Sequence, residues 1–281
     1  MKKEIVAGID IGGTKIAVAL QTLDEKTAAS FRVPTKTDLD PDLLVGEICT
    51  QIQLRTKEQD ATLAAVAVGC PGPLDIEKGL VLSPTNLPNW IDFPLTEFLK
   101  YALNAPTVLE NDANAAAVGE YYYGAGKDFD NVLYVTISTG IGGALIFDGK
   151  LHHGFGASGG EIGHTIVKYD GKMCLCGTRG CLETIGSGKS IVRAAWERLQ
   201  TGEMSELGEL DKRRLTTEAI VEAVKGKDSL ACSVWDEACR FLAIGIGNAI
   251  TTFGPNAVII GGGVANAGDI LFTPLKQNLL K

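Results

Sequence analysis

One histidine and three cysteines within a stretch of 18 residues form a pattern that can hold a metal ion: His164, Cys174, Cys176 and Cys181. Three thiolates and one imidazole complete the tetrahedral ligand set of a closed structural zinc site. The pattern therefore predicts a structural Zn²⁺ bound by these side chains. The remaining cysteines are scattered along the chain, and we expect them to be ordinary buried residues: Cys49, Cys70, Cys232 and Cys239.

Two glycine-rich turns have the composition of phosphate-binding turns, at residues 10–15 (DIGGTK) and 138–143 (STGIGG). Glycine lets backbone N–H groups approach a phosphate because no Cβ stands in the way, Thr14 adds a hydroxyl donor, and Asp10 can hold the water shell of Mg²⁺. The first turn alone could equally be an ordinary β-turn, but the second copy favours phosphate binding. Lys15 has the character of a solvated lysine at the end of a strand.

Carboxylates cluster around the metal pattern and at the start of a helix. Glu161 precedes His164 by three residues and Glu183 follows Cys181 by two, so a metal-bound loop would hold both acids where sugar hydroxyls could donate to them. Asp112 lies where a strand leads into an alanine-rich helix, and a helix N-terminus favours an anion. A lone aspartate there would be a helix cap; beside phosphate turns it becomes a candidate general base.

Strands and helices are expected to alternate as in an α/β protein. Strands are expected at 3–10, 16–20, 28–33, 64–68, 107–109, 131–137, 144–147 and, as a buried strand, 257–260. Helices are expected after the N-cap Asp40 and Pro41, and at 95–103, 111–123, 190–200 and 230–253. Residues 154–159 match the G-x-G-x-x-G spacing of dinucleotide sites, but no strand leads into them and no helix follows, so we expect a loop.

The strand–turn–strand pattern occurs twice, because residues 6–20 can be aligned with residues 133–147. The chain thus repeats one supersecondary unit. Two such halves facing each other would place both glycine turns at a shared cleft, which is a natural place for a ligand.

Length and charge restrict the class of protein. The 281 residues suggest two domains, and 45% hydrophobic with 21% charged residues is an ordinary globular balance. The net charge of −8 disfavours nucleic acid or an anionic membrane as the main partner. Glu4 and Asp10 interrupt the apolar core that a signal peptide would need, and no apolar run is long enough for a spanning helix, so we expect a cytoplasmic protein.

Taken together, the motifs resemble those of the ROK family of sugar kinases and sugar-sensing repressors, and within it the glucokinase branch. They are DxGGTK from Asp10, GxPGxxD from Gly69, ENDAN from Glu110, STGxG from Ser138, GEIGH from Gly160 and CxCGxxGCxE from Cys174. The likeness runs from about Glu4 to Gly268. It implies an α/β fold of the actin-like ATPase or ribonuclease H-like type, with a central cleft between an N-terminal lobe (1–117) and a C-terminal lobe (118–281).

The resemblance also implies a role for each site residue. Asp112 would be the catalytic base that takes the proton from the sugar 6-hydroxyl. The sugar would be bound by Gly72, Asn111, Asp112, Glu161, His164 and Glu183. The nucleotide would be bound by Asp10, Gly12, Gly13, Thr14, Lys15, Thr139, Gly140, Gly262 and Gly263. His164 would face zinc with one ring nitrogen and a sugar hydroxyl with the other.

The activity implied by the resemblance is the ATP-dependent phosphorylation of a hexose, first of all glucose, with Mg²⁺ and structural Zn²⁺, in a homodimer or homotetramer. Three alternatives remain open. The sugar could be another hexose or N-acetylhexosamine, such as N-acetylmannosamine, N-acetylglucosamine, fructose or allose. The donor could be polyphosphate. The protein could instead be a non-catalytic sugar-binding sensor, although only nine residues precede Asp10, where a repressor of this family carries its helix-turn-helix.

Relatives normally continue beyond the equivalent of Lys281 with a further strand and helix. We therefore expect the chain to lack the final C-terminal segment of the family, which bears on the completeness of the adenosine pocket.

Overall fold

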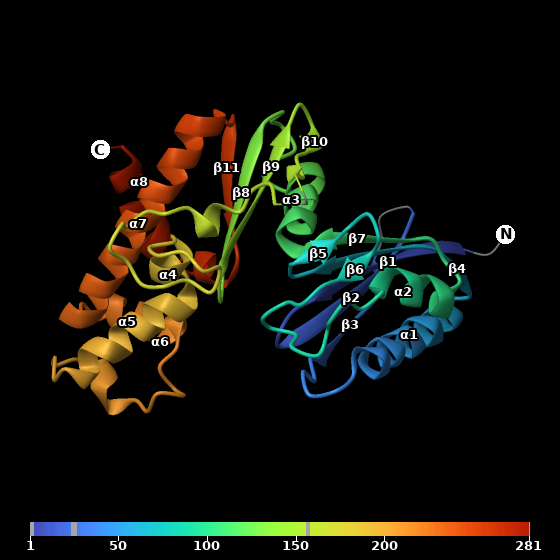
Figure 1. Cartoon of the computed structure of the whole chain (residues 1–281), viewed down its shortest axis with the longest axis horizontal. Helices are drawn as coiled ribbons and strands as arrows, with labels where there is room; N and C mark the ends of the chain where they lie inside the picture. Colours follow the sequence, from blue (N-terminus) through green and yellow to red (C-terminus); the bar gives the residue numbers. More distant parts are fainter. Residues whose placement is uncertain (1–2, 24–26, 156–157, 281) are drawn as a thin grey trace. The chain divides into compact units, whose positions relative to one another are not determined.

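The chain forms two structural units, and each contains one larger sheet (Figure 1). The computed structural model describes residues 3–23, 27–155 and 158–280. Unit 1 comprises Met1–Ala116 with Phe155–Ala157, and unit 2 comprises Ala117–Gly154 with Ser158–Lys281. The loop expected at 154–159 includes residues 156 and 157, which lie outside the described residues.

Unit 1 is built on a five-stranded mixed sheet with the order β3-β2-β1-β4-β7. Its strands are β1 (Lys3–Ile11), β2 (Lys15–Thr22), β3 (Thr27–Pro34), β4 (Ala61–Cys70) and β7 (Thr107–Asn111). β1, β4 and β7 are parallel, whereas β2 is antiparallel to both β1 and β3. Helices α1 (Pro41–Glu58) and α2 (Leu95–Leu103) pack on each other and on β4, and a short hairpin joins β5 (Leu74–Asp75) to β6 (Leu80–Val81).

The core of unit 1 explains why α1 forms where the sequence predicts it. Apolar residues recur at helical spacing, and those facing the sheet are buried: Leu44, Val45, Ile48, Cys49 and Ile52. One detail differs from the prediction. Asp40 occupies the N-cap position, but its side chain makes no capping hydrogen bond. The start of α1 is supported instead by Pro41 in the first turn, whose fixed φ suits a helix.

Unit 2 contains a four-stranded sheet with the order β10-β9-β8-β11. Its strands are β8 (Val132–Ile137), β9 (Ile141–Phe147), β10 (Lys150–Leu151) and β11 (Ala257–Gly261). Its larger helices are α5 (Gly188–Gln200), α6 (Thr217–Lys225), α7 (Ser229–Phe253) and α8 (Asp269–Leu279). Its short helices are α4 (Glu183–Gly186), η2 (Ile162–His164), η3 (Glu206–Glu209) and η4 (Gly263–Ala267). The helix α3 (Asp112–Tyr123) runs from unit 1 into unit 2.

The helices of unit 2 bury one face of this sheet. Side chains from β8 and β9 form one core with those of α5, α6, α7 and α8. The expectation of a buried strand at 257–260 was wrong, since only Ile259 of β11 is buried. The reason is its place in the sheet: β11 is an edge strand that pairs with β8. No helix in the described part of the chain has both the length and the apolar character of a bilayer-spanning segment.

The repeated strand–turn–strand unit is present in both sheets. β1 and β2 pair antiparallel up to Ile11 and Ile16, as β8 and β9 do up to Ile137 and Ile141. The second turn is shorter than predicted, because β9 begins at Ile141. The chain is thus an α/β protein with the duplicated unit that the sequence predicts.

Candidate functional site

Three parallel strands of unit 1 place the candidate base, Asp112, at the carboxyl end of the sheet. Asp10 pairs in register with Gly69, which in turn pairs with Glu110, so Asn111 and Asp112 follow immediately at the carboxyl end of β7. A Cβ on Gly69 would lie 3.6 Å from the Cα of Asp112, which shows how closely α3 begins against β4. The first glycine turn leaves β1 at this same edge. The first glycine turn and the candidate base therefore share one end of the sheet.

The start of α3 is capped by Asn111 rather than by Asp112 alone. The Asn111 Oδ1 accepts hydrogen bonds from the N–H groups of Ala113 at 2.9 Å and Asn114 at 3.2 Å. The Asn114 Nδ2 donates to Glu110 Oε1 at 2.9 Å, and this hydrogen bond stabilises the turn between β7 and α3. Asp112 also accepts from Ala113 N–H, at 2.8 Å. Because Asn111 supplies the cap, Asp112 is not required for it, and the simple capping interpretation of Asp112 loses its basis.

The carboxyl groups of Asp10 and Asp112, at the carboxyl end of the sheet, both have raised pKa values. The side chains of Asp10 and Asp112 reach solvent, but the surrounding strand ends partly desolvate them. This desolvation raises the pKa of Asp112, and the neighbouring charge of Asp10 raises it further. Desolvation likewise raises the pKa of Asp10, against the opposing effect of Lys15. A carboxylate with a raised pKa is a better proton acceptor, as a general base requires.

Two side chains with no predicted role contact the first glycine turn, Thr35 and Asn86. The Thr35 hydroxyl donates to the Gly12 carbonyl at 2.6 Å, and the Thr35 N–H donates to the Thr14 carbonyl at 2.9 Å. Asn86 lies against Gly13, where a Cβ would come within 2.6 Å of the Asn86 Cβ. Gly13 is therefore needed for this close approach. No local signal marks Thr35 or Asn86, since both act on a turn far away in the sequence.

The predicted metal ligands converge in unit 2. The ligand atoms of His164, Cys174, Cys176 and Cys181 all lie within 4.8 Å of one another. The Sγ atoms of Cys176 and Cys181 are 3.6 Å apart, and Cys174 Sγ lies 3.6 Å from His164 Nδ1. Zn–S bonds of about 2.3 Å in a tetrahedron place two sulfur atoms about 3.8 Å apart. The four side chains therefore fit a Zn²⁺ ion, with Nδ1 as the ligand atom of the imidazole.

The ionisation of the thiols also fits a bound dication. Hydrogen bonding by Thr178 lowers the pKa of Cys176 to about 6, so its thiolate is available at neutral pH. Burial raises the pKa of Cys174 to about 12. A cation in the middle of the cluster supplies the charge that ionises such a buried thiol. We use the name metal loop for residues 164–181, which carry all four ligands.

Glycines give the metal loop its turns, and two of them provide a test of its packing. Gly180 has a φ of +76°, and a Cβ there would lie 1.7 Å from the Lys168 carbonyl oxygen, whereas Gly177 has a φ of +90° with nothing near that position. We expect Gly177→Ala to lower the free energy of unfolding by about 1–2 kcal/mol through backbone strain alone. Gly180→Ala should cost about 3 kcal/mol or more, because it adds a steric clash. Denaturant unfolding of both zinc-loaded variants measures the difference; equal losses would contradict the packing.

The two acids that flank the metal loop lie in different surroundings. Glu161 is exposed, and its Oε2 lies 4.0 Å from His164 Nε2, the ring nitrogen that faces away from the cysteines. Glu183 is half-buried at the start of α4, and its Oε2 accepts a hydrogen bond from the Ile141 N–H at 2.9 Å. No sequence pattern predicts this contact between Glu183 and the second glycine turn, 42 residues away.

The second glycine turn lies beside the residues predicted for adenosine. A Cβ on Gly262 would lie 2.4 Å from the Ile137 carbonyl oxygen, and one on Gly263 would lie 3.8 Å from Ser138 Oγ. The Gly188 N–H, at the start of α5, donates to the Ser138 carbonyl at 2.8 Å. Unit 2 therefore brings together the predicted phosphate and adenosine residues. In unit 1, a Cβ on Gly72 would lie 3.9 Å from Asn111 Nδ2, so these two residues predicted to bind the sugar are neighbours.

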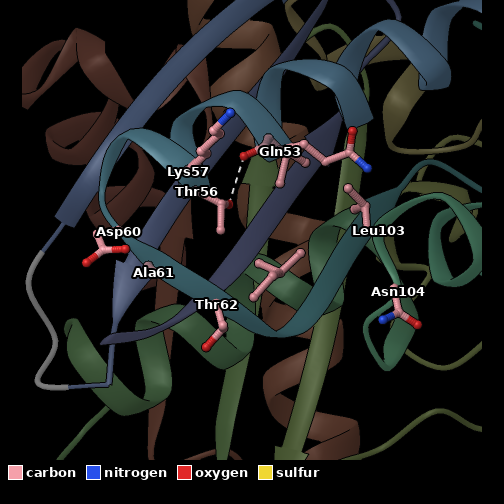
Figure 2. A pocket seen from close by; sticks show the side chains of 10 residues that line it. Gln53, Thr56, Lys57, Asp60, Ala61, Thr62, Leu103 and Asn104 are labelled. Atoms are coloured by element: carbon pink, nitrogen blue, oxygen red, sulfur yellow. Dashed lines mark hydrogen bonds between the residues drawn. The ribbon is translucent and has the colours of Figure 1, made fainter. Parts of the chain in front are cut away.

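A cavity of about 370 Å³ lies at the start of β4. Figure 2 shows the side chains that line it. Asp112 lies beyond the other end of this strand, where Cys70 pairs with Asn111. The cavity is formed where α1 and α2 end and β4 begins. Its lining residues are Ile52, Gln53, Thr56, Lys57, Asp60, Ala61, Thr62, Leu63, Leu103 and Asn104. None of these residues belongs to the predicted site, so this cavity is not the place where the motifs gather.

Comparisons with known proteins find relatives that match nearly the whole chain. A model of the ROK family matches residues 6–281. The glucokinase of Halalkalibacterium halodurans is 34% identical over 277 residues, which cover 96% of this chain and 84% of that protein. The glucokinase of Thermotoga maritima is 34% identical over 282 residues, covering 100% of this chain and 88% of the other.

Among solved structures, the chain resembles a ROK family glucokinase from Streptomyces griseus in complex with glucose and AMPPNP. The TM-score is 0.83 at 33% sequence identity, over 99% of this chain and 90% of that one. Sequence and fold thus agree along nearly the whole chain.

Proposed function

Because the chain belongs to the ROK family, we propose that it is a hexokinase-type phosphotransferase that transfers the terminal phosphoryl group of ATP to the 6-hydroxyl of glucose. The observation that carries this proposal lies at the carboxyl end of the sheet in unit 1. There the first glycine turn follows β1 and Asp112 follows β7, on either side of β4. Glucokinase relatives that match nearly the whole of this chain, and a relative's structure that holds glucose and an ATP analogue, support the choice of sugar and donor.

On the acceptor side, Asp112 takes the proton of the sugar 6-hydroxyl as that oxygen attacks the phosphorus. Its raised pKa suits this task, because the proton must pass to the carboxylate as the new bond forms. Asn111, Gly72 and the acids beside the metal loop orient the sugar through its other hydroxyls. The proposal requires that both units present their groups to one sugar molecule.

On the donor side, catalysis depends mainly on positioning and charge neutralisation. The backbone N–H groups of the two glycine turns bind the phosphates, with Thr14 and Thr139 as hydroxyl donors. Gly262 and Gly263, which lie beside the second glycine turn, would contact the adenosine. Bound Mg²⁺ would neutralise part of the phosphate charge, and Asp10 would hold its water shell.

Zinc has a structural role in this proposal. The four ligands hold the metal loop closed, so that Glu161, His164 and Glu183 keep their places. A zinc-bound Nδ1 leaves Nε2 of His164 free to face a sugar hydroxyl. We also propose, from the family resemblance, that the enzyme is a homodimer or homotetramer, which sedimentation analysis would test.

A coupled ADP-release assay tests the function directly. The panel contains glucose, fructose, allose, N-acetylmannosamine and N-acetylglucosamine, each with ATP and Mg²⁺, and each again with polyphosphate as donor and sugar phosphate as readout. We expect the highest kcat/KM for glucose with ATP. A higher kcat/KM for another sugar would identify that sugar as the preferred substrate of the same site. Sugar binding without any phosphorylation would contradict the kinase and favour the sensor.

The raised pKa of Asp112 predicts the pH dependence of the reaction. The base must be ionised, so kcat/KM should fall as the pH decreases through the pKa of Asp112, which lies above the ordinary value of 3.8. The charge of Asp10 contributes to this shift. Asp10→Asn should therefore move the acid limb of the profile to lower pH, besides lowering the rate. A limb that stays in place or moves to higher pH would contradict the assignment.

A further inference from the structure

The residues that flank the metal loop on both sides pack against the second glycine turn. At the first end, a Cβ on Gly163 would lie 2.0 Å from the Ile141 carbonyl oxygen. At the second end, Glu183 accepts from the Ile141 N–H, and a Cβ on Gly186 would lie 3.3 Å from the Ile141 Cδ1. The backbone and the side chain of Ile141 are thus enclosed by the two segments that carry the first and last metal ligands.

The Glu183 carboxylate makes the most specific of these contacts. Its Oε2 is 2.9 Å from the Ile141 nitrogen, and the same oxygen lies 2.4 Å from where a Cβ on Gly140 would stand. Gly140 must therefore be a glycine for this carboxylate to reach the turn. A charged acceptor on a backbone N–H makes a stronger hydrogen bond than a neutral one. Through this direct hydrogen bond, the segment that follows the metal loop is attached to the second glycine turn.

From this geometry we infer that Glu183 is a positioning residue for the donor phosphate, because it holds the turn at Thr139 and Gly140 in the conformation that binds the nucleotide. The inference rests on the proposed function and goes beyond the sugar contact that the family resemblance implies. Oε2 of Glu183 holds the turn, while Oε1 remains for the sugar. Glu183 then links the metal loop and the second glycine turn of unit 2 to the bound sugar.

The physical reason is the orientation of backbone dipoles. A glycine turn can adopt several backbone conformations, and those that turn an N–H group away from the phosphate lose a binding interaction. The bond from Ile141 to Glu183, together with the Ser138 carbonyl bonded to the Gly188 N–H, restrains the turn on both sides of Gly140. If one restraint is removed, the turn has more conformational freedom to lose when the nucleotide binds. The affinity for the nucleotide is then lower.

The test measures nucleotide binding in the absence of sugar. A non-hydrolysable ATP analogue with Mg²⁺ is titrated calorimetrically into zinc-loaded wild type, Glu183→Ala, Glu183→Gln and Glu161→Ala. We expect Glu183→Ala to weaken binding about 10-fold or more, the scale of a lost hydrogen bond to a charged group. Glu183→Gln keeps an acceptor oxygen and should stay within about 3-fold of wild type. Glu161→Ala, the matched acid at the other end of the loop, should not change nucleotide affinity.

Hydrogen exchange gives a second readout that needs no ligand. The amide of Ile141 should exchange faster in Glu183→Ala than in wild type or in Glu161→Ala, at equal zinc content. Unchanged affinity and exchange in Glu183→Ala would overturn the inference, as would equal loss in Glu161→Ala or no rescue by glutamine. Failure of the wild type to bind the nucleotide would contradict the proposed function itself, and the inference with it.

Discussion

Replacing Asp112 by asparagine is expected to lower kcat about 10²- to 10⁴-fold, the usual contribution of a general base. Asparagine keeps the size and the hydrogen-bond acceptor of the side chain but cannot take the proton of the 6-hydroxyl. Steady-state kinetics with glucose and ATP measures kcat, and direct titration measures the dissociation constants of both substrates. These constants should change little, because the loss falls on the transition state.

The stability of this variant separates a chemical effect from a folding defect. Folding raises the pKa of Asp112, so at pH values above that pKa the ionised carboxylate makes folding less favourable than a neutral side chain would. Asp112→Asn should therefore unfold at the same temperature as wild type or higher. Asp42→Asn is a matched control, since Asp42 is an exposed aspartate in the first turn of α1. Unchanged turnover in Asp112→Asn would contradict its role as base.

Replacing Cys176 by serine is expected to release zinc and to weaken glucose binding about 10-fold or more. Serine cannot replace the thiolate as a zinc ligand, and the metal loop then loses the restraint that holds Glu161, His164 and Glu183. The zinc content measured by metal analysis should fall from about one ion per chain to well below that value. The thermal midpoint should fall too, since the metal-binding free energy contributes to the stability of the loop.

The control for this variant is Cys232→Ser, because Cys232 lies in α7 outside the cluster. It should keep zinc and glucose affinity. If Glu183 connects the loop to the second glycine turn, loss of zinc in Cys176→Ser should also weaken nucleotide binding. Chelation of the wild type should reproduce these effects, and a metal-free wild type with full glucose affinity would contradict the role of the metal.

Local patterns predicted the parts of the structure that depend on neighbours in the sequence. The ranges of α2 and α7, the repeated strand–turn–strand unit and the gathering of the metal ligands agree with the structure. The apolar spacing that predicts a helix is the spacing that buries its face, as in α1. Metal ligands close together in the sequence need few turns to meet, so their spacing is informative.

Most of the helices and strands, the family motifs and the residue types of the site can be predicted from local patterns. The partners that those residues take depend on the tertiary fold: Thr35 and Asn86 at the first glycine turn, and Glu183 at the second. The tertiary fold also decides that Asp40 does not cap α1 and that β11 lies at a sheet edge, half-exposed. The physical reason is that these contacts join segments far apart along the chain, so their geometry depends on how sheets and helices pack, and no local pattern records it.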